Sequence, residues 1–389
     1  MPDRDLLMIP GPIEFEPDVL RAMADKTASH VSPEFVEIFG RALDRMRQVW
    51  LAPDGQPFVV AGSGTLAMEM AAANLVQPGD RALVINTGYF SDRMAAILVR
   101  HGAVVTQVPA PIGTAPAPDE IAHALASDSY KVLVVTHVET STGVRAPVEP
   151  LVRLARQHGA LSIVDGVCST AAEVFRQADW DADVFLTASQ KAIGVPPGLA
   201  LLVASPRAME TWRARRTPVA SVYLDFAEWL PIMEAYMARK PAYFATPPVN
   251  LIYALDVSLG QILAEGMEAR FARHARIGRA FRAAWQALDL SLVPLEESLA
   301  ANTLSAIYYP SGADATLLAG IKQEGVIVAG GLHPEIRTRY FRVGHMGAIT
   351  PNDVLATVGA VERALLGAGS STPPGTALAA AQAVLSERE

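Results

Sequence analysis

Short apolar runs alternate with helix-like stretches through the first half of the chain. Between several of the runs lie stretches with helical spacing and no interior break, such as 64–76 and 91–102. Strands that alternate with helices of this length predict a mainly parallel sheet covered on both faces, and therefore an α/β fold. The runs rich in β-forming residues are 56–62, 81–88, 103–109, 131–139, 161–166, 183–189 and 199–205.

One link departs from this alternation. The segment "QKAIGVPPG", residues 190–198, joins two apolar runs and is too short for a parallel crossover. The runs on either side of it should therefore pair as antiparallel neighbours.

The pattern changes in the second half. A long amphipathic helix with arginines on its exposed face is expected over 266–288. Strands are expected at 304–310, 325–331 and 340–347, with helices over 314–325 and 350–367. We divide the chain into an N-terminal arm (1–20), a large domain (21–255), a small C-terminal domain (256–366) and a flexible tail (367–389).

Composition limits the classes of protein that fit. With 389 residues and 51% hydrophobic content, the chain can bury a large core. The longest apolar runs, such as "LALLVA", are far shorter than the roughly 20 residues of a membrane-spanning helix. The N-terminus also lacks a basic region followed by an apolar one. Neither a membrane nor a secreted protein is expected.

Charge and cysteine content narrow the choice further. A net charge of −8, with 32 basic residues spread along the chain, leaves no basic stripe for nucleic acid. The single cysteine, Cys168, excludes an intrachain disulfide or a multi-cysteine metal site and suits a reducing compartment. We expect a cytoplasmic protein without a metal that acts on small molecules.

The loop after the first strand has the residues of a phosphate site. In "AGSGT", the helix start at Gly64 offers unpaired N–H groups beside the hydroxyls of Ser63 and Thr65. A plain helix cap is the simpler interpretation of the same residues.

The same loop also fits a dinucleotide fingerprint. Gly62, Gly64 and Ala67 match G-x-G-x-x-A, which would make the protein an NAD-dependent dehydrogenase. That fingerprint needs an acid after the next strand, but Asp80 precedes the strand, which ends in Asn86. The dinucleotide interpretation is weakened and remains as an alternative.

Two later loops carry a carboxylate and an ammonium. Asp165 ends an apolar run, where a carboxylate is costly to bury, although such residues also cap helices. Lys191 is one of only five lysines beside 27 arginines. A shielded lysine has a lowered pKa and is a nucleophile toward aldehydes, unless it pairs with Asp183 or reaches solvent. An aldehyde-reactive lysine, a carboxylate and a phosphate cradle together are what pyridoxal 5'-phosphate (PLP) needs.

The sequence also resembles a known family along nearly its whole length. It is similar to the class V branch of fold-type I aminotransferases, and especially to the alanine:glyoxylate and serine:pyruvate aminotransferases. The resemblance implies PLP as cofactor, a large domain with a mainly parallel seven-stranded sheet, a smaller α+β C-terminal domain, and a homodimer with shared active sites. The matching segments include "GPI", "HVSPEF", "AGSGT", "NTGYFSDR", "THVETSTGV", "VDGVCS", "TASQKAIG", "AYFATPP" and "VAGGLH".

The resemblance assigns cofactor roles position by position. Lys191 matches the lysine that binds PLP covalently, and Asp165 the partner of the pyridine nitrogen. Phe90 stands where relatives often place a tryptophan on the ring, and Thr140 matches a hydroxyl near the ring oxygen. The matched phosphate ligands are Ser63, Gly64, Thr65 and Gln190, with Tyr243 and Thr246 reaching the phosphate of the neighbouring subunit.

The substrate should meet a cation. Arg342 lies in a strand-like run, where a guanidinium is costly unless it binds a carboxylate of the substrate or pairs with an acid of the core. The resemblance assigns it the substrate carboxylate. Gly11 and Pro12 match a segment that lines the pocket, and His30 is expected to approach from the other subunit.

The expected reaction is transfer of an amino group from alanine to glyoxylate, which gives pyruvate and glycine. A serine:glyoxylate or serine:pyruvate enzyme differs only in the polarity of its pocket and stays an alternative. A cysteine desulfurase would need a mobile cysteine late in the chain, and none follows Cys168.

Overall fold

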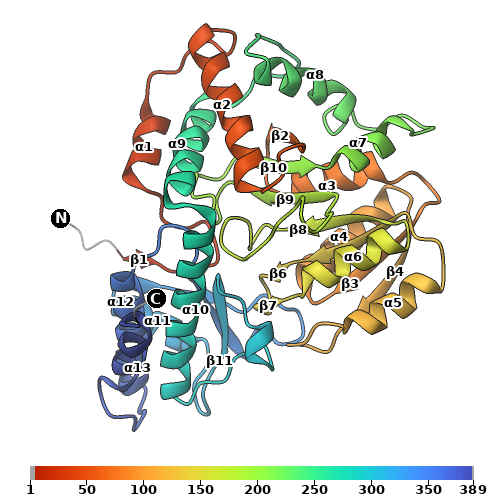
Figure 1. The fold of residues 1–389 in the computed structure, drawn as a ribbon. Helices are drawn as coiled ribbons and strands as arrows, with labels where there is room; N and C mark the ends of the chain where they lie inside the picture. The colour runs from red at the N-terminus through yellow and green to blue at the C-terminus, as the bar shows by residue number, and fades with distance from the viewer. Residues whose placement is uncertain (1–4, 388–389) are drawn as a thin grey trace.

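The computed structural model describes residues 5–387. Residues 1–4 of the expected arm and 388–389 of the expected tail lie outside the described residues. A seven-stranded sheet forms the centre of the larger part of the molecule (Figure 1). In spatial order its strands are β2 (Gln56–Ala61), β10 (Leu199–Ala204), β9 (Val184–Ala188), β8 (Leu161–Asp165), β5 (Val132–Thr136), β3 (Arg81–Asn86) and β4 (Val104–Pro109).

The sheet is mainly parallel, as the sequence predicted. Strand β10 runs antiparallel to both β2 and β9, whereas the pairs from β9 to β4 are all parallel. The short link 190–198 therefore makes the expected antiparallel connection. Every residue of β5, β8, β9 and β10 is buried, which shows that both faces of the sheet are covered.

Helices cover this sheet and begin where the sequence provides start signals. Proline stands in the first turn of α1, α2, α5 and α7, and the Ser32 and Ser205 hydroxyls cap α2 and α7. Helix α3 packs on β9 and β10, and α6 on β5 and β8. The helices of this part are α1 (Pro17–Ala24), α2 (Pro33–Val49), α3 (Gly64–Leu75), α4 (Tyr89–Arg100), α5 (Pro118–Ala126), α6 (Val148–Gln157), α7 (Pro206–Arg213), α8 (Phe226–Met237) and α9 (Val249–Glu265).

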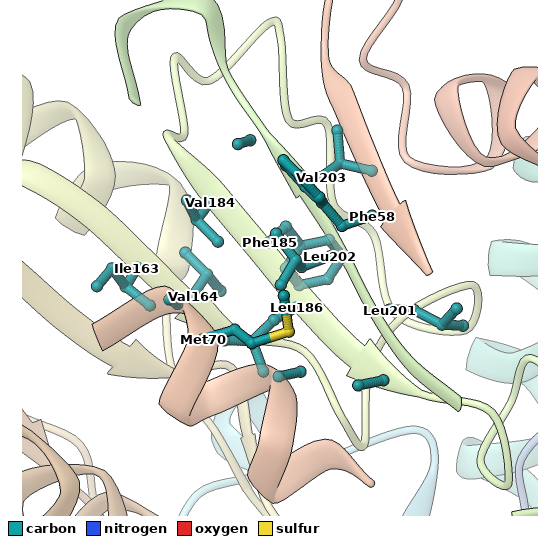
Figure 2. Close-up of a cluster of buried hydrophobic side chains, with 14 of the residues drawn as sticks. Phe58, Met70, Ile163, Val164, Val184, Phe185, Leu186, Leu201, Leu202 and Val203 are labelled. Atoms are coloured by element: carbon teal, nitrogen blue, oxygen red, sulfur yellow. The ribbon is translucent and has the colours of Figure 1, made fainter. Parts of the chain in front are cut away.

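The core between sheet and helices is closely packed. Figure 2 shows Phe58, Phe185 and Leu202 from three neighbouring strands beside Met70 of α3. Phe58, Met70 and Leu202 have no exposed surface. Burial of each such side chain stabilises the fold by about 1.5–3 kcal/mol, so the sheet is a rigid base for the loops at its strand ends.

The C-terminal part has its own hydrophobic core. Phe281 and Trp285 of the long helix stack at 5.5 Å between ring centroids, inside a cluster separate from the first. Its helices are α10 (Met267–Ala287), the 3-10 helix η1 (Glu297–Leu299), α11 (Thr316–Gln323), α12 (Pro351–Gly367) and α13 (Thr376–Leu385). Its three-stranded sheet has the order β11 (Leu304–Tyr308), β14 (Tyr340–Gly344) and β13 (Ala329–Gly330).

Two small pairs of strands complete the structure. Strand β1 (Leu6–Leu7) of the N-terminal arm pairs in parallel with β12 (Val326–Ile327). Strands β6 (Val138–Glu139) and β7 (Val144–Arg145) form a tight antiparallel pair. None of the helices within residues 5–387 has the length and apolar content needed to cross a membrane.

The structure differs from the sequence analysis at several places. The run 325–331, expected as one strand, forms β12 and β13, which belong to different sheets. The boundary drawn after residue 255 falls inside α9, whose Leu259 and Ile262 still belong to the larger core. The expected flexible tail holds α13, which packs on α10 and α12 (Figure 1). Arg270 of α10 is buried instead of exposed, because its guanidinium donates to the carbonyls of Ala171 and Ala192.

Candidate active site

Lys191 lies in the loop that follows β9 and is only 8% exposed. Its Nζ donates to the carbonyl oxygen of Pro10, so the N-terminal arm reaches the lysine. Burial is the largest influence and lowers the pKa of Lys191. Nearby Arg342 lowers the pKa further, whereas Cys168 and Asp165 raise it. A lowered pKa favours the neutral, nucleophilic amine.

Asp165 is the last residue of β8, the strand beside β9. The carboxylate is buried, and its Oδ1 accepts a 2.9 Å hydrogen bond from the N–H of Val167. Within residues 5–387 no ion pair to it is found. Burial raises its pKa to about 6, against the opposing effects of the Val167 N–H, Lys191 and Arg93. The site therefore holds a buried carboxylate without a bonded cation.

The N-terminus of α3 opens toward the same edge of the sheet. Ser63 is the N-cap, yet its exposed hydroxyl caps no backbone N–H. Gly64 is buried, and a methyl group there would lie 2.8 Å from Cγ2 of Val167. The side chain of Val167, in the loop that follows Asp165, thus packs against the start of α3, whose first N–H groups are suited to bind an anion.

Phe90 lies in the first turn of α4 and contacts Arg93, a residue that the sequence analysis missed. The guanidinium of Arg93 lies 4.9 Å from the centroid of the Phe90 ring and 5.1 Å from that of Tyr89. It also donates to Thr65 Oγ1 at 3.1 Å. The available signal was the arginine one helical turn after Phe90, on the same face of the helix. Arg93 links the ring residue to the proposed phosphate cradle.

Thr140 and Arg342 meet across the two parts of the chain. Arg342 is half-buried on β14, and its Nη1 donates to the carbonyl of Thr140 at 3.2 Å. Its Nε donates to the carbonyl of Gly330. Burial lowers the pKa of Arg342. No acid within residues 5–387 forms an ion pair with it, so pairing with an acid of the core, the competing expectation, is wrong.

The remaining residues expected near Lys191 belong to two loops. The carbonyl of Gln190 accepts from the N–H of Ile13 at 3.2 Å, which brings the segment of Gly11 and Pro12 against the lysine loop. The side chain of Gln190 is half-buried. The role of Gly11 and Pro12 in lining the pocket stays a prediction.

Tyr243 and Thr246 lie in the segment between α8 and α9, and Tyr243 contacts His30. The rings of His30 and Tyr243 lie 5.1 Å apart between centroids, and Tyr243 is 62% exposed. Thr246 is exposed as well. In the described part of the chain, neither hydrogen bonds nor ring contacts connect these three side chains to Lys191 of the same chain.

Comparisons with known proteins define the family. The model of the family "Aminotransferase class-V" matches residues 19–346. Alanine–glyoxylate aminotransferase 1 of Saccharomyces cerevisiae is 40% identical over 90% of this chain and 93% of its own. L-aspartate–glyoxylate aminotransferase of Paracoccus denitrificans is 35% identical over 98% and 96%. The crystal structure of alanine–glyoxylate aminotransferase from Nostoc sp. superposes with a TM-score of 0.87, at 32% identity over 93% and 95%.

The chain therefore belongs to the class V aminotransferases. It is an aminotransferase, and the family uses PLP. The predicted family, fold class and cofactor are confirmed. The NAD-dependent dehydrogenase alternative is wrong, because the loop of Gly62, Gly64 and Ala67 lies within the residues that match the aminotransferase family. Strand β3 indeed ends at Asn86, whose amide donates to Asp92 and Gln107, so the acid of a dinucleotide site is missing there.

The residues present fit PLP. Asp165 is a buried carboxylate with no bonded cation, which a protonated ring nitrogen would supply. The uncapped Ser63 hydroxyl and the start of α3 fit a phosphate. Lys191, with its lowered pKa, fits an aldehyde. The three groups of PLP thus each find a matching group of the chain.

The close packing at Gly64, in the proposed phosphate site at the start of α3, can be tested by adding a methyl group. In Gly64→Ala the new methyl group would crowd Val167 and Ala188, which lie 2.8 and 3.3 Å from its position. We expect the dissociation constant of PLP, titrated into the cofactor-free protein, to rise roughly tenfold, as for loss of one strong hydrogen bond to a charged group. Gly367→Ala is the control, because nothing lies within 4 Å of its added methyl group. An unchanged dissociation constant in Gly64→Ala would remove Gly64 from the phosphate site.

Proposed function

We propose that this chain transfers the amino group of alanine to glyoxylate, with PLP as cofactor, and so forms pyruvate and glycine. One observation carries the proposal. Asp165 ends β8, Lys191 lies in the loop after the neighbouring parallel strand β9, and Arg342 donates to the carbonyl of Thr140, beyond the end of β5 on the other side of β8, so the three groups lie at one edge of the sheet. A nucleophilic amine, a carboxylate and an unpaired guanidinium at one place support chemistry on an amino acid. The yeast relative, named for alanine and glyoxylate, supports the choice of substrates.

Bound PLP supplies an electron-withdrawing ring that makes the proton on the substrate Cα removable. Lys191 would bind the cofactor covalently. Its Nζ, once released, would move that proton from Cα to a carbon of the cofactor, and in the second half-reaction would move a proton from that carbon to the Cα of the new amino acid. Asp165 would face the ring nitrogen and stabilise positive charge there. Phe90 would pack on the ring, and Thr140 would bind near the ring oxygen. The phosphate would be held by Ser63, Gly64, Thr65 and Gln190.

The surroundings of Lys191 favour a small apolar donor. Ala192, Cys168, Ile13 and Met346 belong to one buried apolar cluster at this loop. A methyl group suits such surroundings, whereas a second carboxylate would lose hydration without a new partner. This observation supports alanine over aspartate, the donor in the name of the relative from Paracoccus denitrificans.

A donor panel tests the reaction. Purified holoenzyme is mixed with alanine, serine or aspartate, with glyoxylate as acceptor, and glycine is quantified by mass spectrometry. We expect the highest kcat/KM with alanine. A higher value with serine would establish the serine alternative, and a higher value with aspartate would contradict the argument from the apolar cluster.

Arg342 is proposed to bind the carboxylate of both substrates. Removing one charge-assisted hydrogen-bonding partner costs about 1.5–3 kcal/mol, so Arg342→Gln should lower kcat/KM for alanine about 10- to 100-fold. Most of the change should appear in KM, because the carboxylate is bound before and during reaction. Arg337→Gln, an exposed arginine nearby in the chain, is the control. Equal kinetics of Arg342→Gln and Arg337→Gln would refute the assignment.

We further propose a homodimer located in the cytoplasm. The exposed Tyr243 and Thr246, together with His30, lie apart from Lys191, which supports their use in the site of a second copy. Light scattering of the purified protein measures the mass of the assembly. The single buried thiol, Cys168, supports a reducing compartment.

A further inference from the structure

Glu139 is a fully buried carboxylate at the end of β6 that no assigned role explains. Its Oε1 accepts from the N–H of Ser141 at 3.0 Å and from the hydroxyl of the same residue at 2.7 Å. Its Oε2 accepts from the N–H groups of Phe90 and Ser91 at 3.0 and 3.2 Å. No arginine, lysine or histidine in the described part of the chain forms an ion pair with it. Burial of a carboxylate that has hydrogen-bond donors but no cation as partner costs free energy of folding.

The donors come from two separate segments. The N–H groups of Phe90 and Ser91 belong to the first turn of α4, where the helix dipole favours a negative charge. Ser141 lies in the turn between β6 and β7. A methyl group at Gly88 would lie 2.8 Å from Cγ of Glu139, so only glycine lets the carboxylate approach the helix start. Glu139 thus joins two loops that are distant in sequence.

Each of these loops carries a residue of the site. The α4 start carries Phe90, whose backbone N–H is bound directly. The turn contains Thr140, whose carbonyl receives the bond from Arg342. The next carbonyl, of Ser141, accepts from the hydroxyl of Tyr340, two residues before Arg342 on β14. The strand that carries Arg342 therefore contacts the larger part of the molecule at this turn.

We propose that Glu139 is a positioning residue that fixes Phe90 through the start of α4 and Arg342 through the turn 139–141. The proposal rests on the proposed function in that these two residues are taken as ligands of cofactor and substrate. Both carboxylate oxygens already accept several hydrogen bonds, so Glu139 does not bind substrate itself. Through one ionised group it connects Phe90, which is proposed to contact the cofactor ring, with Arg342, which is proposed to bind the substrate carboxylate.

The ionised state is compatible with assay conditions. Burial raises the pKa of Glu139 to about 6, opposed by the hydrogen bonds from Ser141 and Ser91, and Asp165 raises it further. At pH 8 the carboxylate is ionised, and every N–H and O–H around it can donate. The measurements below are therefore made at pH 8.

The test uses the full chain with Glu139→Gln, which keeps the shape but turns one acceptor oxygen into an NH₂ group that faces N–H donors. The loss of charge-assisted hydrogen bonds should raise the dissociation constant of PLP, titrated into cofactor-free protein, and the KM for alanine, each roughly tenfold. The kcat of saturated enzyme should change by less than about threefold, since Lys191 and Asp165 are untouched.

Glu362→Gln is the matched control. Glu362 is also a buried carboxylate that accepts two N–H groups at a helix start, those of Gly375 and Ala377 beside α13, both at 2.9 Å. We expect it to lower the Tm while the dissociation constant of PLP and the KM stay at the wild-type values. If Glu139→Gln behaves in the same way, Glu139 has a structural role only and the proposal is overturned.

A milder variant covers the case in which Glu139→Gln does not fold. Ser141→Ala removes the hydroxyl that donates to Oε1 and that accepts the N–H of Tyr89 at the start of α4, and it should raise both constants about threefold. Unchanged constants in Ser141→Ala would overturn the proposal on their own. The PLP titration needs no amino donor, so a wrong donor would appear in wild-type turnover, whereas a wrong role for Glu139 would appear in the titration.

Discussion

Lys191→Ala should lower kcat for the transfer from alanine to glyoxylate by at least roughly 10²–10⁴-fold, the usual contribution of a positioned proton-transfer group. The structure leaves few substitutes for its amine. Lys191 is buried, and burial lowers the pKa of its amine, which favours the neutral form of Nζ. The loss should appear in kcat more than in KM for alanine, because Arg342 would still bind the carboxylate.

A chemical readout separates this role from folding. Borohydride reduction of the wild-type holoenzyme followed by peptide mass mapping should place the cofactor on the peptide that contains Lys191. In Lys191→Ala the cofactor should wash away after the same treatment. Lys322→Ala, an exposed lysine on α11, is the control and should retain both label and turnover. A label on any other peptide would refute the assignment.

Much of the fold followed from the sequence because its signals are local. Buried parallel strands read as continuous apolar runs, and the short link 190–198 required an antiparallel pair. The burial of Arg270 could not be read in this way. The residue has helical spacing and a charge, and beside the nearby carboxylate of Glu265 its partners are carbonyls of residues 171 and 192, far away in sequence. Tertiary contacts decide such positions.

The residues of the site also divide into those that local sequence signals reveal and those that only tertiary contacts reveal. Lys191, Asp165 and Arg342 were detectable because a charge in an apolar run is costly and so points to a purpose. Arg93 and Glu139 were missed as functional groups, since each lies in a polar stretch where a charge is ordinary. Their significance comes from what they touch, namely a ring, a hydroxyl and backbone N–H groups.

Asp165→Asn should lower kcat by about 10²–10³-fold, the usual effect of removing one preorganised electrostatic group. The affinity for PLP should change less, because the contacts to phosphate and the covalent bond to Lys191 persist. Asp256→Asn is the control. That buried aspartate pairs with Arg41 and Arg45, at 2.5 and 2.6 Å, so its replacement should lower the Tm while kcat of the folded enzyme stays the same. Full turnover in Asp165→Asn would contradict the proposed role.

Although Asp165→Asn should impair turnover, it should stabilise the cofactor-free protein against unfolding. Burial raises the pKa of Asp165 from 3.8 to about 6. The folded state therefore holds its proton more tightly than the unfolded state, and the contribution of Asp165 to wild-type stability falls as pH rises from about 4 to 6. Above pH 6 the full cost is present, on the order of 3 kcal/mol.

Asparagine keeps an acceptor for the N–H of Val167 but carries no charge. Cofactor-free Asp165→Asn should accordingly unfold at a higher urea concentration than wild type at pH 8, and the difference should vanish near pH 4. Added PLP should then stabilise wild type more than the variant, since only the wild type gains a partner for a buried charge. A variant less stable than wild type at pH 8 would mean that the carboxylate is already compensated without the cofactor, and that Asp165 is not kept for a cationic ligand.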